Sequence, residues 1–371
     1  MTMTPKGLYI HVPFCRRKCN YCDFCSVSCE GVSDEYIDRL LAEARLYVRD
    51  GRIPIDTVYF GGGTPSLLKP SQLERIMSAL ADAFEIRTDS EITLECNPGT
   101  ADREGLSAFH RLGVNRLSLG LQSIHENELI ALGRIHDFSK FLDTYSTARA
   151  VGFDNISVDI MYGIAHQTVG SFEETLKTLL SLSPEHLSVY GLIVEEGTPF
   201  FAARDKLPLP DEDAECDMYY LADRLLREAG YLHYEISNYA RAGFESRHNL
   251  KYWRDLEYIG LGVSAYSYFE GVRYGNTRSL GVYLSGGGIR EDVNILTPFD
   301  KRYEYAMMRL RLAEGISLSE YERLFGVPFA EGKEEIISDY VSRGLMRIQD
   351  GRLSFTAEGF YISNSLLVNI L

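Results

Sequence analysis

Six short apolar segments, separated by five longer amphipathic ones, fill most of the first 195 or so residues and constrain the fold more than any other feature. The apolar segments have the length and composition of strands and cover residues 7–12, 57–60, 91–95, 116–120, 155–160 and 186–191. Between them, apolar residues recur at helical spacing over residues 36–48, 73–84, 103–112, 138–150 and 172–181. Consecutive strand–helix units predict an α/β fold with a parallel sheet, right-handed crossovers and helices on the outer face. Periodicity does not decide between an open barrel and a doubly wound sheet.

The regular alternation ends after Pro199, and two further regions follow. An extended connector, Leu207-Pro-Leu-Pro210, precedes a predicted helix over 211–229 and a Gly- and Tyr-rich stretch that begins at Tyr252. From about residue 297 the pattern predicts three helices, two short strands around Asp350-Gly351 and a final helix. This order predicts a winged-helix-like module, with a helical cap over the sheet as the alternative. We therefore expect domains over 1–200, 201–296 and 297–371.

Charge and cysteine usage narrow the functional classes. Lys and Arg number 38 against 53 Asp and Glu, a net charge of −15, which argues against nucleic acid as a partner. No uncharged apolar run reaches the roughly 18 residues that span a bilayer, so we expect a cytoplasmic protein, with peripheral membrane contact still open. Five of the seven cysteines crowd into residues 15–29. In a reducing compartment this clustering favours metal binding over disulfides.

The cysteine motif Cys15-x3-Cys19-x2-Cys22 follows the first predicted strand. Three thiolates within eight residues suit an iron–sulfur cluster better than structural zinc, which takes four ligands. Three cysteine ligands leave one iron of a cubane open for another molecule. The basic run at 16–18 is expected to lower the pKa of the thiols and to offset the charge of an anionic cluster.

The motif and its flanking residues resemble the radical S-adenosylmethionine (SAM) superfamily. Tyr9-Ile-His-Val-Pro-Phe-Cys15 and Tyr21-Cys22-Asp-Phe24 are similar to the branch that contains oxygen-independent coproporphyrinogen III dehydrogenase (HemN) and the HemW-type heme chaperones. The resemblance implies a partial (β/α)6 TIM-like barrel with an accessory α+β region and a C-terminal HemN-type module. It also implies a 4Fe–4S cluster on Cys15, Cys19 and Cys22 whose open iron binds SAM.

The resemblance extends to residues that bind SAM in the family. It implies this role for Gly62, Gly63, Thr64, Glu95, Gln122, Arg134 and Asp159. Glu95, Gln122 and Asp159 independently fall at or just beyond the ends of predicted strands, where parallel α/β folds place their sites. Tyr9 lies within the first strand and is expected either beside the cluster or SAM, or in the core.

Two sequence features favour a HemW-type protein over a HemN-type enzyme. The HemN pattern has a fourth cysteine two places after the third, where this chain has Phe24, and a longer segment before the motif than the fourteen residues here. In addition, His248-Asn-Leu-Lys-Tyr252-Trp253 matches the His-Asn-x-x-Tyr-Trp signature of HemW-like proteins. A histidine beside an aromatic pair offers an iron ligand and flat walls for heme, although such a histidine is often a packing residue. The roles of Cys25 and Cys29 stay open.

The resemblance therefore implies a radical SAM heme chaperone that binds heme and passes it to acceptor proteins, with an electron donor for the cluster as a further partner. One alternative is an enzyme that decarboxylates coproporphyrinogen III to protoporphyrinogen IX. Another is a related radical SAM methyltransferase, since one barrel hosts several chemistries. The sequence leaves open whether a second SAM binds.

Overall fold

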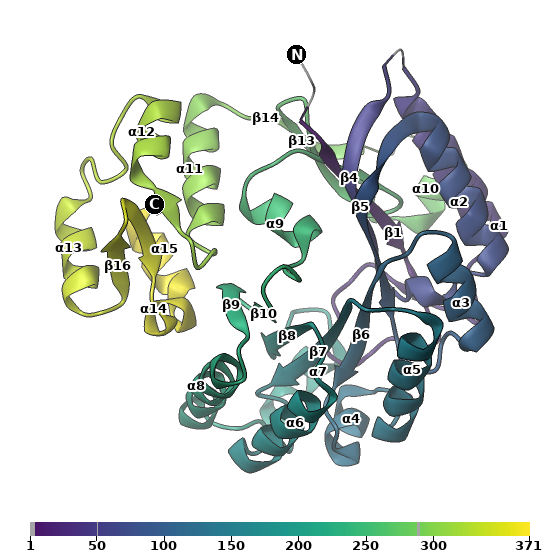
Figure 1. Ribbon diagram of the computed structural model, residues 1–371, viewed down its shortest axis with the longest axis horizontal. Helices are drawn as coiled ribbons and strands as arrows, with labels where there is room; N and C mark the ends of the chain where they lie inside the picture. Colours follow the sequence, from purple (N-terminus) through teal and green to yellow (C-terminus); the bar gives the residue numbers. More distant parts are fainter. Residues whose placement is uncertain (1–3, 50, 288–289) are drawn as a thin grey trace.

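A mixed sheet of twelve strands organises the computed structural model, which describes residues 4–49, 51–287 and 290–371 (Figure 1). Its parallel centre runs in the order β11-β1-β4-β5-β6-β7-β8. These strands are β11 (Tyr258–Leu261), β1 (Lys6–Val12), β4 (Ile53–Gly62), β5 (Phe84–Cys96), β6 (Arg116–Gln122), β7 (Ile156–Tyr162) and β8 (His186–Gly191). From β1 to β8, the strands of this sheet lie side by side in the order in which they occur in the sequence, whereas a doubly wound sheet reverses its order at a switch point. The strands thus form an open, barrel-like sheet, and no closed barrel forms within the described ranges.

Antiparallel strands extend the sheet at both edges. Strands β12 (Tyr266–Phe269), β13 (Val272–Asn276) and β14 (Arg290–Ile295) follow β11 on one side. On the other side β10 (Asn238–Ala240) pairs with β8 and β9 (Leu232–Glu235). The accessory region also carries α8 (Glu212–Glu228), α9 (Arg247–Trp253) and α10 (Leu280–Ser285). The seventh parallel strand, β11, was not predicted, because four residues with one glycine give no periodic signal.

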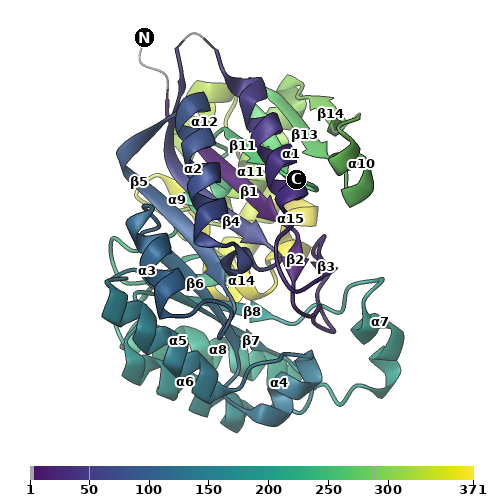
Figure 2. The same ribbon diagram turned by 90° about the vertical axis from the view of Figure 1, so that its right-hand side faces the viewer.

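Amphipathic helices cover the outer face of the sheet, as expected. They are α1 (Asp34–Ala44), α2 (Pro70–Ala83), α3 (Arg103–Arg111), α5 (Phe138–Val151) and α6 (Val169–Leu182) (Figures 1 and 2). The short helix α4 (Glu126–Leu132) packs through Leu132 in a separate small cluster with Met161 and Phe200. Strand β6 shows how the two faces separate. Leu117, Leu119 and Leu121 are fully buried in the main hydrophobic cluster with apolar residues of these helices, while the alternate residues face the inside of the curved sheet. Removal of this apolar surface from water is the main stabilising term.

The C-terminal module has its own hydrophobic cluster and lies across the open side of the sheet from α1 and α2 (Figure 1). It contains α11 (Pro298–Arg309), β15 (Ile316–Ser317), α12 (Leu318–Phe325), α13 (Glu334–Ser342), β16 (Met346–Gln349), β17 (Arg352–Phe355), α14 (Ala357–Tyr361) and α15 (Ser363–Ile370). The predicted hairpin is present, and Asp350 (φ 51°) and Gly351 (φ 72°) both adopt the left-handed conformation that a two-residue hairpin turn requires. The order of helices and strands is winged-helix-like. None of the helices in the described part of the chain has both the length and the apolar character needed to cross a bilayer.

Candidate cofactor site and an adjoining cavity

A cavity of about 290 Å³ opens inside the curved sheet, beside the cysteine motif. Strand β6 contributes every second residue to its wall, namely Arg116, Ser118, Gly120 and Gln122. Strands β4, β5, β7 and β8 add polar side chains at matching positions. The sheet therefore presents a polar inner surface to any molecule that enters from the carboxyl ends of the strands.

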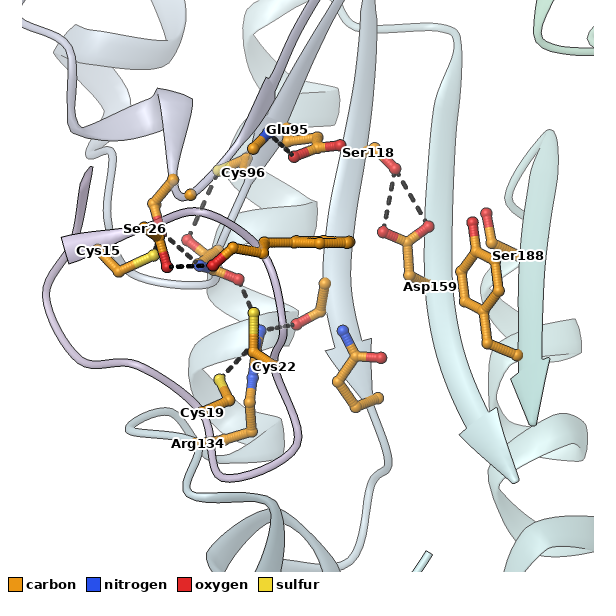
Figure 3. A pocket seen from close by; sticks show the side chains of 18 of the residues that line it. Cys15, Cys19, Cys22, Ser26, Glu95, Cys96, Ser118, Arg134, Asp159 and Ser188 are labelled. Atoms are coloured by element: carbon orange, nitrogen blue, oxygen red, sulfur yellow. Dashed lines mark hydrogen bonds between the residues drawn. The ribbon is translucent and has the colours of Figure 1, made fainter. Parts of the chain in front are cut away.

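The three motif cysteines line one wall of this cavity (Figure 3). Cys15 ends β2 (Phe14–Cys15), which pairs with β3 (Val27–Ser28) so that the loop between them folds back on itself. All three are free thiols. Thr64 Oγ1 donates to the Cys15 sulfur at 3.4 Å, and Arg134 Nη1 donates to the Cys19 sulfur at 3.5 Å. Hydroxyl and guanidinium donors beside sulfur stabilise a thiolate that carries negative charge.

Within the described ranges, no group of three or more His, Cys, Asp or Glu side chains is close enough to hold a single metal ion. A cubane differs from a single ion, because each cysteine binds a different iron at a different corner. Three thiols spread around one wall of a cavity fit this larger group. The arrangement therefore fits a cluster and does not fit a mononuclear site.

The expected effect of the basic run on the thiols is wrong for two of the three cysteines. Burial raises the pKa of Cys15 and of Cys22, and this outweighs the opposing effect of hydrogen bonds and nearby cations. Arg16 donates to the carbonyl of Gly99 and Lys18 to that of Phe24. Lys18 still lowers the pKa of Cys22, but burial raises that pKa by more.

The glycine segment that ends β4 packs directly against the first strand. Gly62 has φ 109°, and a Cβ there would lie 2.5 Å from the His11 ring, so no larger residue fits. Its N–H donates to Glu95 Oε2 at 3.1 Å. A Cβ on Gly63 would lie 2.7 Å from backbone atoms of Phe14. With Thr64, the two glycines form a tight wall on which a ligand meets backbone rather than side chains.

Two carboxylates face the cavity, and each disfavours ionisation of the other. Burial, together with the charge of Asp159, raises the pKa of Glu95 to about 7. Burial also raises the pKa of Asp159, although Ser118 Oγ donates to both of its carboxylate oxygens at 3.1 Å (Figure 3). A cavity with two such carboxylates favours a ligand that brings hydroxyl or ammonium donors and positive charge. Glu95 lies at the end of its strand as expected, whereas Asp159 lies in the middle of β7, deeper than predicted.

Gln122 and Arg134 lie close together at the carboxyl end of β6. Gln122 is the last residue of the strand and its backbone has φ 73°. This left-handed conformation is uncommon for a residue other than glycine and costs energy. The guanidinium of Arg134 donates from Nη2 to Asn97 Oδ1 (2.6 Å) and to the carbonyl of Gly120 (2.5 Å). Arg134 thus ties the ends of β5 and β6 to the cysteine loop.

Sequence reasoning missed several residues that line the same cavity, including Arg116, His186, Tyr190 and Asn249. For Arg116, His186 and Tyr190 the signal is the period of two along β6 and β8, whereas Asn249 belongs to the His-Asn-x-x-Tyr-Trp segment on α9. Arg116 is 2% exposed, and its Nε atom has no hydrogen-bond partner among the described residues. A buried polar atom of this kind normally meets water or a ligand, so the inner end of the cavity offers a donor to an incoming molecule.

A second cavity, of about 570 Å³, adjoins the first and shares Phe24, Gly62 and Glu95 with it. Tyr9 lines this second cavity, and it does not line the first, where SAM or the cluster was expected beside it. His248 lines neither cavity: its side chain is 0% exposed and lies in a stack with Tyr9 and Tyr59. Tyr252 and Trp253, from the same signature, do line the second cavity.

Two family models match the chain. The model described as the radical SAM superfamily matches residues 9–179, and the model of the HemN C-terminal domain matches residues 296–362. The heme chaperone HemW of Lactococcus lactis is 33% identical over 376 aligned residues, which cover 100% of this chain and 98% of that protein. HemW of Escherichia coli is 35% identical over 86% of each chain. The mouse mitochondrial radical S-adenosyl methionine domain-containing protein 1 is 36% identical over 99% of this chain and 88% of its own length.

Among solved structures, coproporphyrinogen III oxidase (HemN) from Escherichia coli has a similar fold. The TM-score is 0.85 at 25% identity, over 99% of this chain and 90% of that one. The likeness therefore includes the open sheet, the accessory strands and the C-terminal module.

Proposed function

The chain belongs to the radical SAM superfamily and, within it, to the family of the heme chaperone HemW, and from this premise we propose that it binds heme and passes it to heme-requiring proteins. The observation that carries the proposal is the similarity to HemW proteins over the full chain, together with a cavity beside the cysteine motif that fits the superfamily's cofactors.

The first cavity is proposed to hold a 4Fe–4S cluster and SAM. Cys15, Cys19 and Cys22 bind the cluster from the loop after β1. The residues proposed to bind SAM are Gly62, Gly63, Thr64, Glu95, Gln122, Arg134 and Asp159. When bound, the cluster and SAM supply one-electron chemistry. The residues of the chain position both groups, because Arg134 contacts the cysteine loop and the SAM side of the cavity at once.

The His-Asn-x-x-Tyr-Trp segment is proposed to serve heme through Tyr252 and Trp253, which line the second cavity. His248 supports this wall from behind, because both of its ring nitrogens are engaged by Thr57 and Tyr252. Direct contact between His248 and heme requires one of these hydrogen bonds to break. Tyr9 stacks on the same histidine and forms the next part of the wall.

Further partners follow from the same proposal. A cluster that works with SAM needs an electron donor, and a heme chaperone needs acceptor proteins. The net charge of −15 argues against nucleic acid. Five of the seven cysteines cluster at residues 15–29 in a pattern that suits a metal cluster, which favours a reducing compartment, and we propose that the protein acts in the cytoplasm.

The second candidate function is oxidative decarboxylation of coproporphyrinogen III, which the structural similarity to HemN favours. One experiment tests both. Anaerobically purified, reconstituted protein is titrated with heme, and separately incubated with coproporphyrinogen III, SAM and a reductant. Heme binding at micromolar concentration without porphyrinogen turnover supports the chaperone. Formation of protoporphyrinogen IX that is lost in Cys19→Ala, with no binding of heme, contradicts it.

A further inference from the structure

The second cavity has flat aromatic walls assembled from three separate parts of the chain. The aromatic residues are Tyr9, Phe24, Tyr252, Trp253, Tyr258 and Tyr266. They come from β1, the cysteine loop and the α9–β12 segment, and α11 of the C-terminal module adds Met308 (Figure 1). Phe24 is 63% exposed and Tyr266 is 50% exposed, so these rings present apolar surface that the protein itself does not cover. A cavity of about 570 Å³ with such walls is of the size that takes a large planar ligand.

The charged groups of this cavity differ in how far they are already paired. Arg273 pairs with Asp255 at 2.9 Å and with Glu304 at 2.6 Å, so its guanidinium is occupied. Arg278 is exposed, and its side chain has no ion pair or hydrogen bond to the part of the chain that the structure describes. The free cation lies at the solvent-exposed edge of the aromatic cavity. A planar apolar ligand with carboxylates along one edge matches this layout.

The cavity lining also includes side chains that could bind the iron of such a ligand, and some of them are already hydrogen-bonded within the protein. His11 lines the cavity, but its Nε2 lies 2.8 Å from the carbonyl of Cys25 and its Nδ1 lies 3.1 Å from the Tyr9 hydroxyl. The Cys25 thiol makes only a weak, 3.4 Å contact with the carbonyl of Arg278, and its backbone is held in place by His11. A weak S–H contact is easily exchanged for a bond to a metal. Cys25 is thus the better placed of the two sulfur donors, the other being Met308.

We propose that heme binds in this second cavity, between the aromatic walls, with the Cys25 sulfur as an iron ligand and Arg278 as the partner of a propionate. This inference rests on the proposed function and gives it a location. On binding, the thiol loses its proton to solvent and the sulfur donates an electron pair to iron, so the step needs no oxidant or reductant. Because Phe24, Gly62 and Glu95 line both cavities, heme bound there lies next to the SAM site.

The test compares heme titrations of the full, reconstituted protein and its variants, followed by absorption and electron paramagnetic resonance. Cys25→Ser is expected to weaken heme binding at least tenfold and to remove the spectral signature of thiolate ligation. Cys29→Ser is the matched control, because its thiol lies 2.9 Å from the carbonyl of Gly31 and does not line the cavity. Arg278→Glu is expected to weaken binding about tenfold, since a like charge replaces the partner of a carboxylate. Arg224→Glu, on the exposed face of α8, is the control for this charge reversal and should leave the affinity for heme unchanged.

The outcomes separate the two proposals. If the unaltered protein binds no heme, the proposed function fails and this inference fails with it. If it binds heme and Cys25→Ser keeps both the affinity and the signature, the proposed function stands and the second cavity is not the site as described. The same conclusion follows if Met308→Leu alone changes the iron signal.

Discussion

The Nε2 atom of His248 lies 2.8 Å from the Tyr252 hydroxyl, one helical turn away on α9, while Nδ1 lies 2.9 Å from Thr57 Oγ1 on β4. Both ring nitrogens are therefore occupied inside a fully buried site. The histidine fixes the position of Tyr252, whose ring faces the proposed heme cavity. This pair links the family signature to the aromatic wall without placing the imidazole on iron.

Acid should destabilise the protein partly through His248. Burial lowers the pKa of His248 to about 3, against roughly 6.5 when unfolded, so the unfolded state binds the extra proton as the pH falls below about 6.5. The histidine's contribution is complete above the unfolded pKa and is lost progressively as the pH falls toward 3. Between pH 7.5 and 5.5 this amounts to about 1.4 kcal/mol. Urea unfolding at pH 7.5 and at pH 5.5 measures the fall in the free energy of unfolding between the two conditions. In His248→Gln this fall should be smaller by about 1.4 kcal/mol than in the unaltered protein. In a control variant of the exposed His110 it should be the same as in the unaltered protein.

Affinity for SAM should rise with pH because of Glu95. Its pKa is raised to about 7, and the ionised carboxylate is the form that binds a donor or a cation. Between pH 6 and 8 the ionised fraction, and with it the affinity, should increase about tenfold. Calorimetric titration under anaerobic conditions measures this slope. Glu95→Gln should bind more weakly with a flatter profile, and an unchanged slope in that variant would assign the titration to another group.

Cluster assembly should depend on the motif cysteines and not on their neighbours. Cys19→Ala removes a ligand and also leaves Arg134 without its sulfur partner. Iron and sulfide content after reconstitution should therefore fall to a small fraction of normal in this variant. Cys29→Ser should assemble the cluster normally, and equal loss in both variants would argue against the assigned ligand set.

Gly62 should tolerate no side chain. A Cβ there meets the His11 ring at 2.5 Å on a backbone with φ 109°, so Gly62→Ala combines a clash with left-handed strain. We expect a loss of about 2–4 kcal/mol in the free energy of unfolding. Gly230→Ala is the matched control, because Gly230 has φ 85° and open space around it. That variant should lose only about 1–2 kcal/mol, and equal losses would show that the contact with His11 is not limiting.

The sequence predicted those strands and turns whose structure is determined by residues close together in the chain. The apolar residues at 116–120 predicted strand β6, and the Asp350-Gly351 pair specifies its turn by backbone conformation alone. The second cavity escaped prediction because its wall joins Tyr9, Tyr252 and Met308, residues brought together only by the tertiary fold. The raised pKa values of Cys15 and Cys22 were not predicted for a related reason. Burial depends on the whole fold, and its effect on these pKa values outweighs that of the charges next to the cysteines in sequence.

Heme transfer is the most direct test of the central claim. Heme-loaded protein is mixed with an apo heme protein, and the appearance of the holo spectrum is timed against passive release of heme to a scavenger. A chaperone should deliver heme faster than it releases heme to the scavenger, at a rate that rises with acceptor concentration. A transfer rate equal to passive release at every acceptor concentration would contradict the proposed function.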